Sequence, residues 1–357
     1  MSRSKDSDVS SEGFTVLHDP LDANIDLIFV HGLGGHPFST WAIRKPKSGS
    51  DVIETPNHTK TQRPSFLSSL CCFGTHTEDE DNIPADNSAD SSGAIQLTEM
   101  SYWPRDLLAE SPTCANVRVL TYGYDSKVTK GFAAANQNNL FAHARDLLYA
   151  LQRKKPQRRP VIFVAHSLGG LLVKEVLRRS HYSDETELRD IIMSTKGVMF
   201  LGTPHRGSQE LAKLGETVRS IAAFTLRIDS NSELLRALGT ESPELELGRE
   251  AFLTLWRIYN FRVKTFREAY GISGVNVGPM NQKVVPDISS TLDDPREHAE
   301  TIPANHMDMC RFNQKFETGY QKISGELDVM IGMCDSGLTI SDAGKGMIPA
   351  NGVELSS

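Results

Sequence analysis

The stretch from residue 159 to residue 179, RPVIFVAHSLGGLLVKEVLRR, constrains the fold more than any other part of the chain. It begins with β-forming residues at 161–164 and continues, from Leu171, with a helical composition. Only a few small residues separate the two, so a strand must turn sharply into a helix around Ser167. A side chain at such a turn stands exposed above the end of the strand, as the serine of a nucleophile elbow does.

The turn departs from the usual G-x-S-x-G pattern at its first glycine, which is Ala165 in this chain. Strand and helix nearly touch at an elbow, so the residues that flank the serine must be small. Alanine is the least costly departure from glycine. We therefore predict that Ser167 is a nucleophile, provided that the chain also supplies a base, an acid and an oxyanion hole.

The pattern along the rest of the chain predicts an α/β fold with a mostly parallel central sheet flanked by helices. Short apolar runs typical of buried parallel strands alternate with helical patterns, at residues 25–30, 117–122, 197–201 and 262–266.

We expect a single domain over residues 14–330, interrupted by a disordered insertion at 44–97 that is rich in Ser, Asp, Asn, Thr and Pro. A helical segment at about 208–260 is expected to cover the site. Residues 1–13 and 331–357 are predicted to be disordered tails.

Composition and charge narrow the choice of function. The net charge of −7 gives no electrostatic reason to expect nucleic acid as a partner. No apolar run approaches the length of about eighteen residues that a transmembrane helix needs. The N-terminus lacks the apolar core of a signal peptide, and the five cysteines show no zinc spacing. These features predict a cytoplasmic protein without a bound metal.

The order Ser, acid, His that α/β-hydrolases follow indicates where to look for the base. The last two histidines are His298 and His306. His298 lies in a charged run typical of a solvated loop. His306 lies just before a predicted amphipathic helix over 307–327, where the catalytic loop should be, so we predict His306 as the base. His166 neighbours the nucleophile and is expected to pack against the turn or to orient it.

Two carboxylates compete for the role of the acid. Glu268 follows the predicted strand at 262–266 and is the preferred residue, because the acid belongs at the carboxyl end of a late strand. Asp287 is the alternative, and the competing interpretation of Glu268 is a surface salt bridge with Arg262 or Arg267.

The oxyanion hole requires two backbone N–H groups that point at the developing negative charge. One is expected from Leu168, which follows the nucleophile, and the other from Leu33 in the glycine loop HGLGG. The glycine spacing of this loop does not match that of a nucleotide-binding loop.

Taken together, these pieces resemble the serine esterase/lipase group that includes the SERAC-type (serine-active-site-containing) proteins and the N-terminal hydrolase domains of fungal NACHT or NB-ARC/ankyrin proteins. The matching pieces are IFVHGLGGHPFSTW (28–41), YWPRDLLAE (102–110), RVLTYGYDS (118–126), VAHSLGGLLVKEVL (164–177), FLGTPHRGS (200–208) and NHMDMCRF (305–312).

The resemblance implies an α/β-hydrolase fold, a Ser167/His306 pair and activity on carboxylic esters, lipids or lipid-like molecules among them, with no metal or organic cofactor. The chain departs from the group at Ala165, in its insertion at 44–97, and at Asn305, where the group often has Asp.

Three functions remain open at this point: ester hydrolysis through an acyl-enzyme, acyl transfer between lipids, and use of the fold as a signalling or effector module. The expected partner is a small-molecule ester or lipid, with peripheral contact to a mitochondrial or endoplasmic-reticulum membrane, where SERAC-type relatives are found. The oligomeric state stays open. Cys71 and Cys72 lie in a short apolar patch that suggests palmitoylation. The favoured interpretation is an unmodified apolar patch in a disordered loop.

Overall fold

In the computed structural model the chain divides into two units, one formed by residues 1–44 and 100–357 and the other by residues 45–99. The structure describes residues 8–32, 34–45, 99–126, 133–205, 243–271, 283, 285, 287 and 289–335, and the side chains of 133–139 and 243–246 are excepted. Most of the predicted insertion and tails, the helical cover as far as residue 242, and the Cys71/Cys72 patch lie outside these residues.

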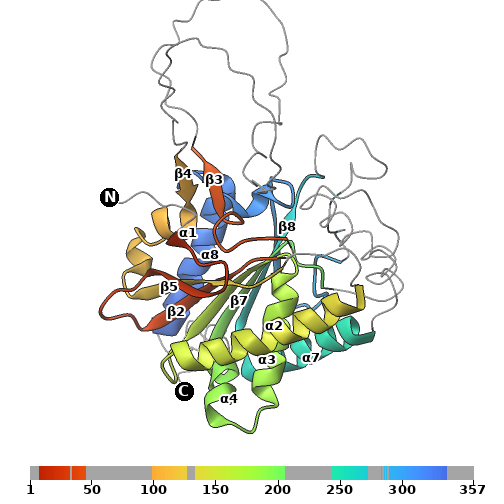
Figure 1. Cartoon of the computed structure of the whole chain (residues 1–357). Coiled ribbons are helices and arrows are strands. Elements are labelled where there is room, and N and C mark those ends of the chain that lie inside the picture. The colour runs from red at the N-terminus through yellow and green to blue at the C-terminus, as the bar shows by residue number, and fades with distance from the viewer. Residues whose placement is uncertain are drawn as a thin grey trace, which may run out of the picture. The chain divides into compact units, whose positions relative to one another are not determined.

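A seven-stranded sheet forms the centre of the first unit (Figure 1). Its strand order is β1-β5-β2-β6-β7-β8-β9. Every neighbouring pair is parallel except β1 and β5. The strands are β1 (Gly13–His18), β2 (Ile25–Val30), β5 (Val117–Gly123), β6 (Val161–His166), β7 (Thr195–Leu201), β8 (Arg262–Glu268) and β9 (His298–Ile302). A separate two-stranded sheet pairs β3 (Ala42–Arg44) with β4 (Met100–Tyr102).

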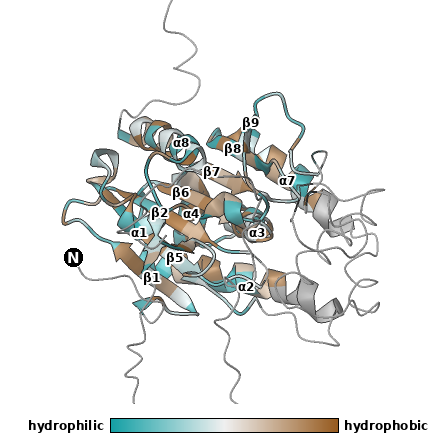
Figure 2. Ribbon diagram, turned by 90° about the horizontal axis from the view of Figure 1, so that it is seen from above, coloured by the Kyte–Doolittle hydropathy of each residue, from teal (hydrophilic) through white to brown (hydrophobic). Residues whose placement is uncertain are grey.

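Helices cover both faces of this sheet, and the alternation of side chains along each strand divides the core between them. In β2, Leu27 and Phe29 belong to one apolar cluster, whereas Ile28 and Val30 belong to the other. Figure 2 shows α8 on one face and α2 and α3 on the other, with the apolar strands between them. The helices are α1 (Trp103–Asp106), α2 (Ala133–Lys154), α3 (Gly169–His181), α4 (Thr186–Ser194), α7 (Pro243–Tyr259) and α8 (Thr318–Asp335).

This arrangement confirms the predicted α/β-hydrolase class, a mostly parallel sheet flanked by helices. Because the strands on both sides of β6 run parallel to it, their carboxyl ends meet at one edge of the sheet. Residues that follow these strands gather at that edge, where open α/β sheets bind ligands.

The prediction of one amphipathic helix over 307–327 is wrong in its first half. Asp308–Cys310 forms a single 3-10 turn, and the helix α8 begins only at Thr318. Met309 and Phe312 are buried, but they lie in a loop and not in a helix. Phe316 is 72% exposed, whereas a residue on the buried face of a helix would be covered. The helix also continues to Asp335, past the predicted start of the C-terminal tail.

Candidate active site

Ser167 occupies a sharp turn between β6 and α3, as the elbow pattern predicts. Its backbone φ is 55°, a left-handed conformation that costs a non-glycine residue about 1–2 kcal/mol. The surrounding backbone maintains this strain: the Ser167 N–H donates to the carbonyl of Leu201 over 2.8 Å, and the Ser167 carbonyl accepts from the Thr203 hydroxyl over 3.0 Å. The expectation that its side chain stands exposed is wrong: Ser167 is 1% exposed, because the His306 ring and the backbone at Gly32 pack against it.

Close contacts explain which small residues the elbow requires. A Cβ on Gly169 would lie 2.4 Å from the His31 carbonyl oxygen, and a Cβ on Gly170 would lie 2.3 Å from the Thr203 hydroxyl. Both positions therefore exclude a side chain. Ala165 is a strand residue opposite Val30, and its methyl group joins the apolar core, so the first glycine of the usual pattern is not needed here.

His306 lies beside the nucleophile. Its Nε2 is 3.1 Å from the Ser167 Oγ, and its side chain is 1% exposed. Gly202, whose φ is 57°, packs against the His306 ring. A Cβ at this position would lie only 3.0 Å from His306 Nδ1. The alternative histidine, His298, begins the edge strand β9 and is exposed to solvent.

Asn305 holds the loop that carries His306. Its Oδ1 accepts hydrogen bonds from the backbone N–H groups of Met307 and Asp308, each over 3.0 Å, and its Nδ2 donates to the Asp308 carboxylate. An aspartate could accept the same two N–H bonds. The replacement of Asp by Asn therefore keeps the turn, and it exchanges a repulsive carboxylate pair for a hydrogen bond.

Glu268, the last residue of β8, is the carboxylate that the structure brings to His306. Its Oε2 lies 3.2 Å from His306 Nδ1, and both side chains are 1% exposed. The two atoms are not aligned as a hydrogen bond, and neither has another hydrogen-bond partner among the described residues. Oε1 accepts the backbone N–H of Val285 over 2.6 Å. Asp287 instead pairs with Lys283 and is 56% exposed.

The glycine loop after β2 also packs against the nucleophile. A Cβ on Gly32 would lie 2.7 Å from the Cβ of Ser167, and Ser126 bonds the loop at Gly34 and Gly35. Of the two expected oxyanion donors, Leu168 is the N-cap residue of α3 and is half-buried, whereas Leu33 lies outside the described residues.

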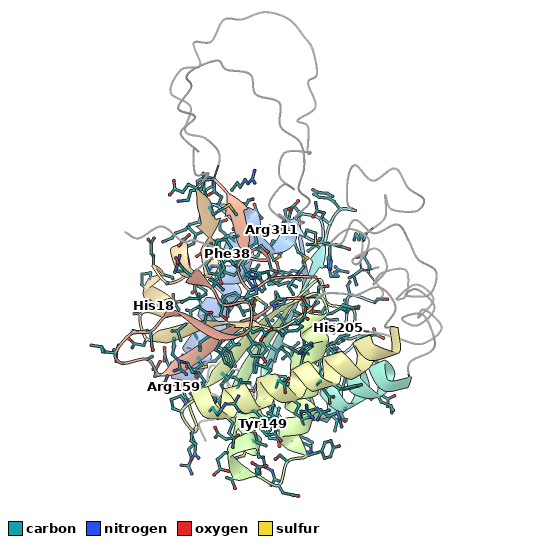
Figure 3. All side chains as sticks on the ribbon, in the orientation of Figure 1. His18, Phe38, Tyr149, Arg159, His205 and Arg311 are labelled. Atoms are coloured by element: carbon teal, nitrogen blue, oxygen red, sulfur yellow. The ribbon has the colours of Figure 1, made fainter. Side chains whose placement is uncertain are left out.

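Arg311 connects the glycine-loop region to the loop of His306, because its guanidinium donates to the Ser39 carbonyl over 3.2 Å. In Figure 3, Phe38 and Arg311 lie together at this end of the sheet, and Arg159, just before β6, lies toward the other end.

Three further histidines are buried around the site, and burial is the main cause that lowers the pKa of each. For His31 the pKa falls to about 4, and for His166 and His205 it falls well below the ordinary value. His31 stacks on Tyr124 with ring centroids 4.4 Å apart, and His205 Nδ1 lies 2.7 Å from the buried Lys174 amine. The burial of His31 and His205 beside the site was not predicted from the sequence, although each follows a strand in a glycine-containing motif.

Within the described part of the chain, no group of His, Cys, Asp and Glu side chains is arranged to hold a metal ion. The helices described there are also too short or too polar to cross a membrane.

Comparison with known proteins gives sequence relatives over most of the chain. It is 28% identical to Protein SERAC1 of Homo sapiens over 322 residues, which are 87% of this chain and 40% of that protein. It is also 28% identical to Protein SERAC1 of Danio rerio, over 85% of this chain and 39% of that protein. The chain thus spans about 40% of the length of these relatives. It is homologous to the SERAC1 proteins, which confirms the resemblance seen in the sequence.

No protein-family model matches the chain. Among solved structures, it is similar to a hydrolase from Oleispira antarctica, with 11% identity and a TM-score of 0.40 over 93% of this chain and 98% of that chain. It is also similar to the type II thioesterase BorB from the borrelidin biosynthetic cluster, with 11% identity and a TM-score of 0.39 over 90% and 96% of the two chains.

Proposed function

We propose that this homologue of the SERAC1 proteins is a serine hydrolase that cleaves carboxylic esters, lipid or lipid-like esters among them, through an acyl-enzyme. One observation carries the proposal: the buried His306 ring lies between the nucleophile and a carboxylate. Its Nε2 is 3.1 Å from Ser167 Oγ, and its Nδ1 is 3.2 Å from Glu268 Oε2. The three groups follow one another along the chain in the order typical of α/β-hydrolases.

In the proposed mechanism, Ser167 Oγ attacks the carbonyl carbon of the ester while His306 Nε2 takes its proton. The carbonyl π pair moves to oxygen, and the resulting oxyanion accepts hydrogen bonds from the N–H groups of Leu168 and Leu33. When the tetrahedral intermediate collapses, the proton on His306 passes to the leaving alcohol. Water then attacks the acyl-enzyme in the same way, which releases the carboxylic acid and restores the serine.

Glu268 has two functions in this scheme. Its Oε2 faces Nδ1 and favours the tautomer that leaves Nε2 free to accept the serine proton, and its charge stabilises the imidazolium that forms. Its other oxygen is held by the N–H of Val285, so the carboxylate is already oriented before the reaction begins. The burial of both side chains strengthens their interaction relative to one in water.

A fluorophosphonate probe tests the proposal without knowledge of the natural substrate, because it reacts with any activated serine of this kind. We expect labelling at Ser167 in the full chain and none in Ser167→Ala. A folded wild-type chain that is not labelled, or equal labelling of the variant, would refute the proposal.

Substrate class and acceptor require a second measurement. A panel of lipid and short-chain esters should release free acid at a rate that depends on Ser167. If an added lipid alcohol instead receives the acyl group, acyl transfer is the activity. If Ser167→Ala retains full cellular function, the chain acts as a signalling or effector module.

A further inference from the structure

His166 forms a direct link between the strand of the nucleophile and the loop of the base. Its Nε2 lies 2.9 Å from the backbone carbonyl oxygen of His306, although the two residues are 140 positions apart in the chain. The two imidazole rings also contact each other, with centroids 4.9 Å apart. Since His166 directly precedes Ser167, one side chain and one peptide bond separate the base loop from the nucleophile.

The chemistry of this contact fixes the state of His166. A carbonyl oxygen can only accept a hydrogen bond, so Nε2 of His166 must carry the hydrogen. His166 is 3% exposed, and burial, together with the nearby His306, Arg311 and His31, lowers its pKa well below the ordinary value. The ring is therefore a neutral donor that places no second positive charge beside His306 when His306 takes the serine proton.

The contacts of Asn305 and Glu268 do not themselves hold the backbone of His306. Asn305 fixes the turn after it, and Glu268 faces one ring nitrogen. A shift of the His306 carbonyl would carry the ring away from Ser167 even if both contacts persisted. A shift of about 1 Å in such a group can cost on the order of a hundredfold in rate.

We propose that His166 is a positioning residue, whose Nε2–H holds the carbonyl of His306 and so fixes the base relative to Ser167. This inference rests on the proposed function, because it assigns a role in the same reaction. A merely structural histidine would contribute ring packing against Trp41 and His306 and could be replaced by any side chain of similar size.

Two near-isosteric variants separate the hydrogen bond from the packing. His166→Gln keeps an N–H donor close to the position of Nε2, whereas His166→Met has a similar length and no donor. We expect His166→Met to lower the rate of fluorophosphonate labelling at Ser167 by about 10- to 100-fold. His166→Gln should stay within about threefold of wild type, and in ester hydrolysis the loss should appear in kcat, with KM changed by less than about twofold.

Equal rates in the two variants, whether both high or both low, would overturn the inference, since the hydrogen bond would then not matter. Ser167→Ala separates this failure from that of the proposed function. If the wild-type chain is not labelled, or if Ser167→Ala is labelled, both proposals fall. If labelling depends on Ser167 but the two His166 variants react at equal rates, only the inference about His166 falls. Should His166→Met not fold, long-range ¹H–¹⁵N spectra of the wild-type chain provide the second test. We expect the Nε2–H tautomer for His166, and an Nδ1–H tautomer would overturn the inference.

Discussion

Replacement of Glu268 by glutamine removes one negative charge from the proposed triad with almost no change of shape. The charge lies 3.2 Å from His306 Nδ1, and at an effective dielectric constant of about 20 the attraction to an imidazolium at that distance is roughly 5 kcal/mol. Each 1.36 kcal/mol is a factor of ten in rate, so the loss corresponds to nearly four orders of magnitude. We expect Glu268→Gln to lower kcat/KM by about 10³- to 10⁴-fold.

The assay is hydrolysis of a chromogenic short-chain ester, with Asp287→Asn as the matched control. Both variants convert a carboxylate into an amide, but Asp287 is 56% exposed and pairs with Lys283, so the control should retain wild-type activity. The glutamine oxygen can still accept the N–H of Val285, so the melting temperature should change by a few degrees at most. A Glu268→Gln enzyme with more than a tenth of wild-type activity, or an inactive Asp287→Asn enzyme, would refute the reasoning.

Three other outcomes are expected. Gly32→Ala should lower the rate of fluorophosphonate labelling at least tenfold, because its Cβ would lie 2.7 Å from the Cβ of the nucleophile; unchanged labelling would contradict the close approach of the glycine loop. Asn305→Ala should lower both activity and the free energy of unfolding, the latter by about 1 kcal/mol, whereas Asn305→Asp should retain most of both; the two variants are compared by kinetics and urea unfolding. The free energy of unfolding should fall by about 1 kcal/mol per buried neutral histidine between pH 7 and about pH 5.5, because the pKa lowered by burial returns to about 6.5 on unfolding. This stability is present above the unfolded pKa and is lost progressively as the pH falls from there toward the lowered folded pKa. A flat urea-unfolding profile would contradict the burial of His31, His166 and His205.

The order of motifs along the chain was sufficient to predict most of the sheet and to choose Ser167, His306 and Glu268 as candidates. The structure places these three residues in contact. Ser167 and His306 follow strands and Glu268 ends one, and parallel strands place their carboxyl ends at one edge. The strand β9 escaped prediction because its sequence, HAETI, is mostly polar: it is an edge strand, and only Ile302 is fully buried.

Other features depend on contacts that leave no mark in a local pattern. The separation of Glu268 and Asp287 along the chain does not indicate which carboxylate faces His306, since the answer depends on how the chain after β8 returns. The bond from His166 to the His306 carbonyl joins residues 140 positions apart, and the motif around Ser167 is equally compatible with a histidine that only packs.

The left-handed backbone at Ser167 bears on which residues the elbow can accept at this position. Glycine adopts a φ of 55° without steric cost, and relief of this strain offsets the entropy that glycine loses on folding. A serine-to-glycine change at this position would thus delete the hydroxyl without straining the backbone of the turn. The backbone of the elbow alone therefore does not require a serine at position 167, and Ser167→Gly is a second variant that removes the hydroxyl.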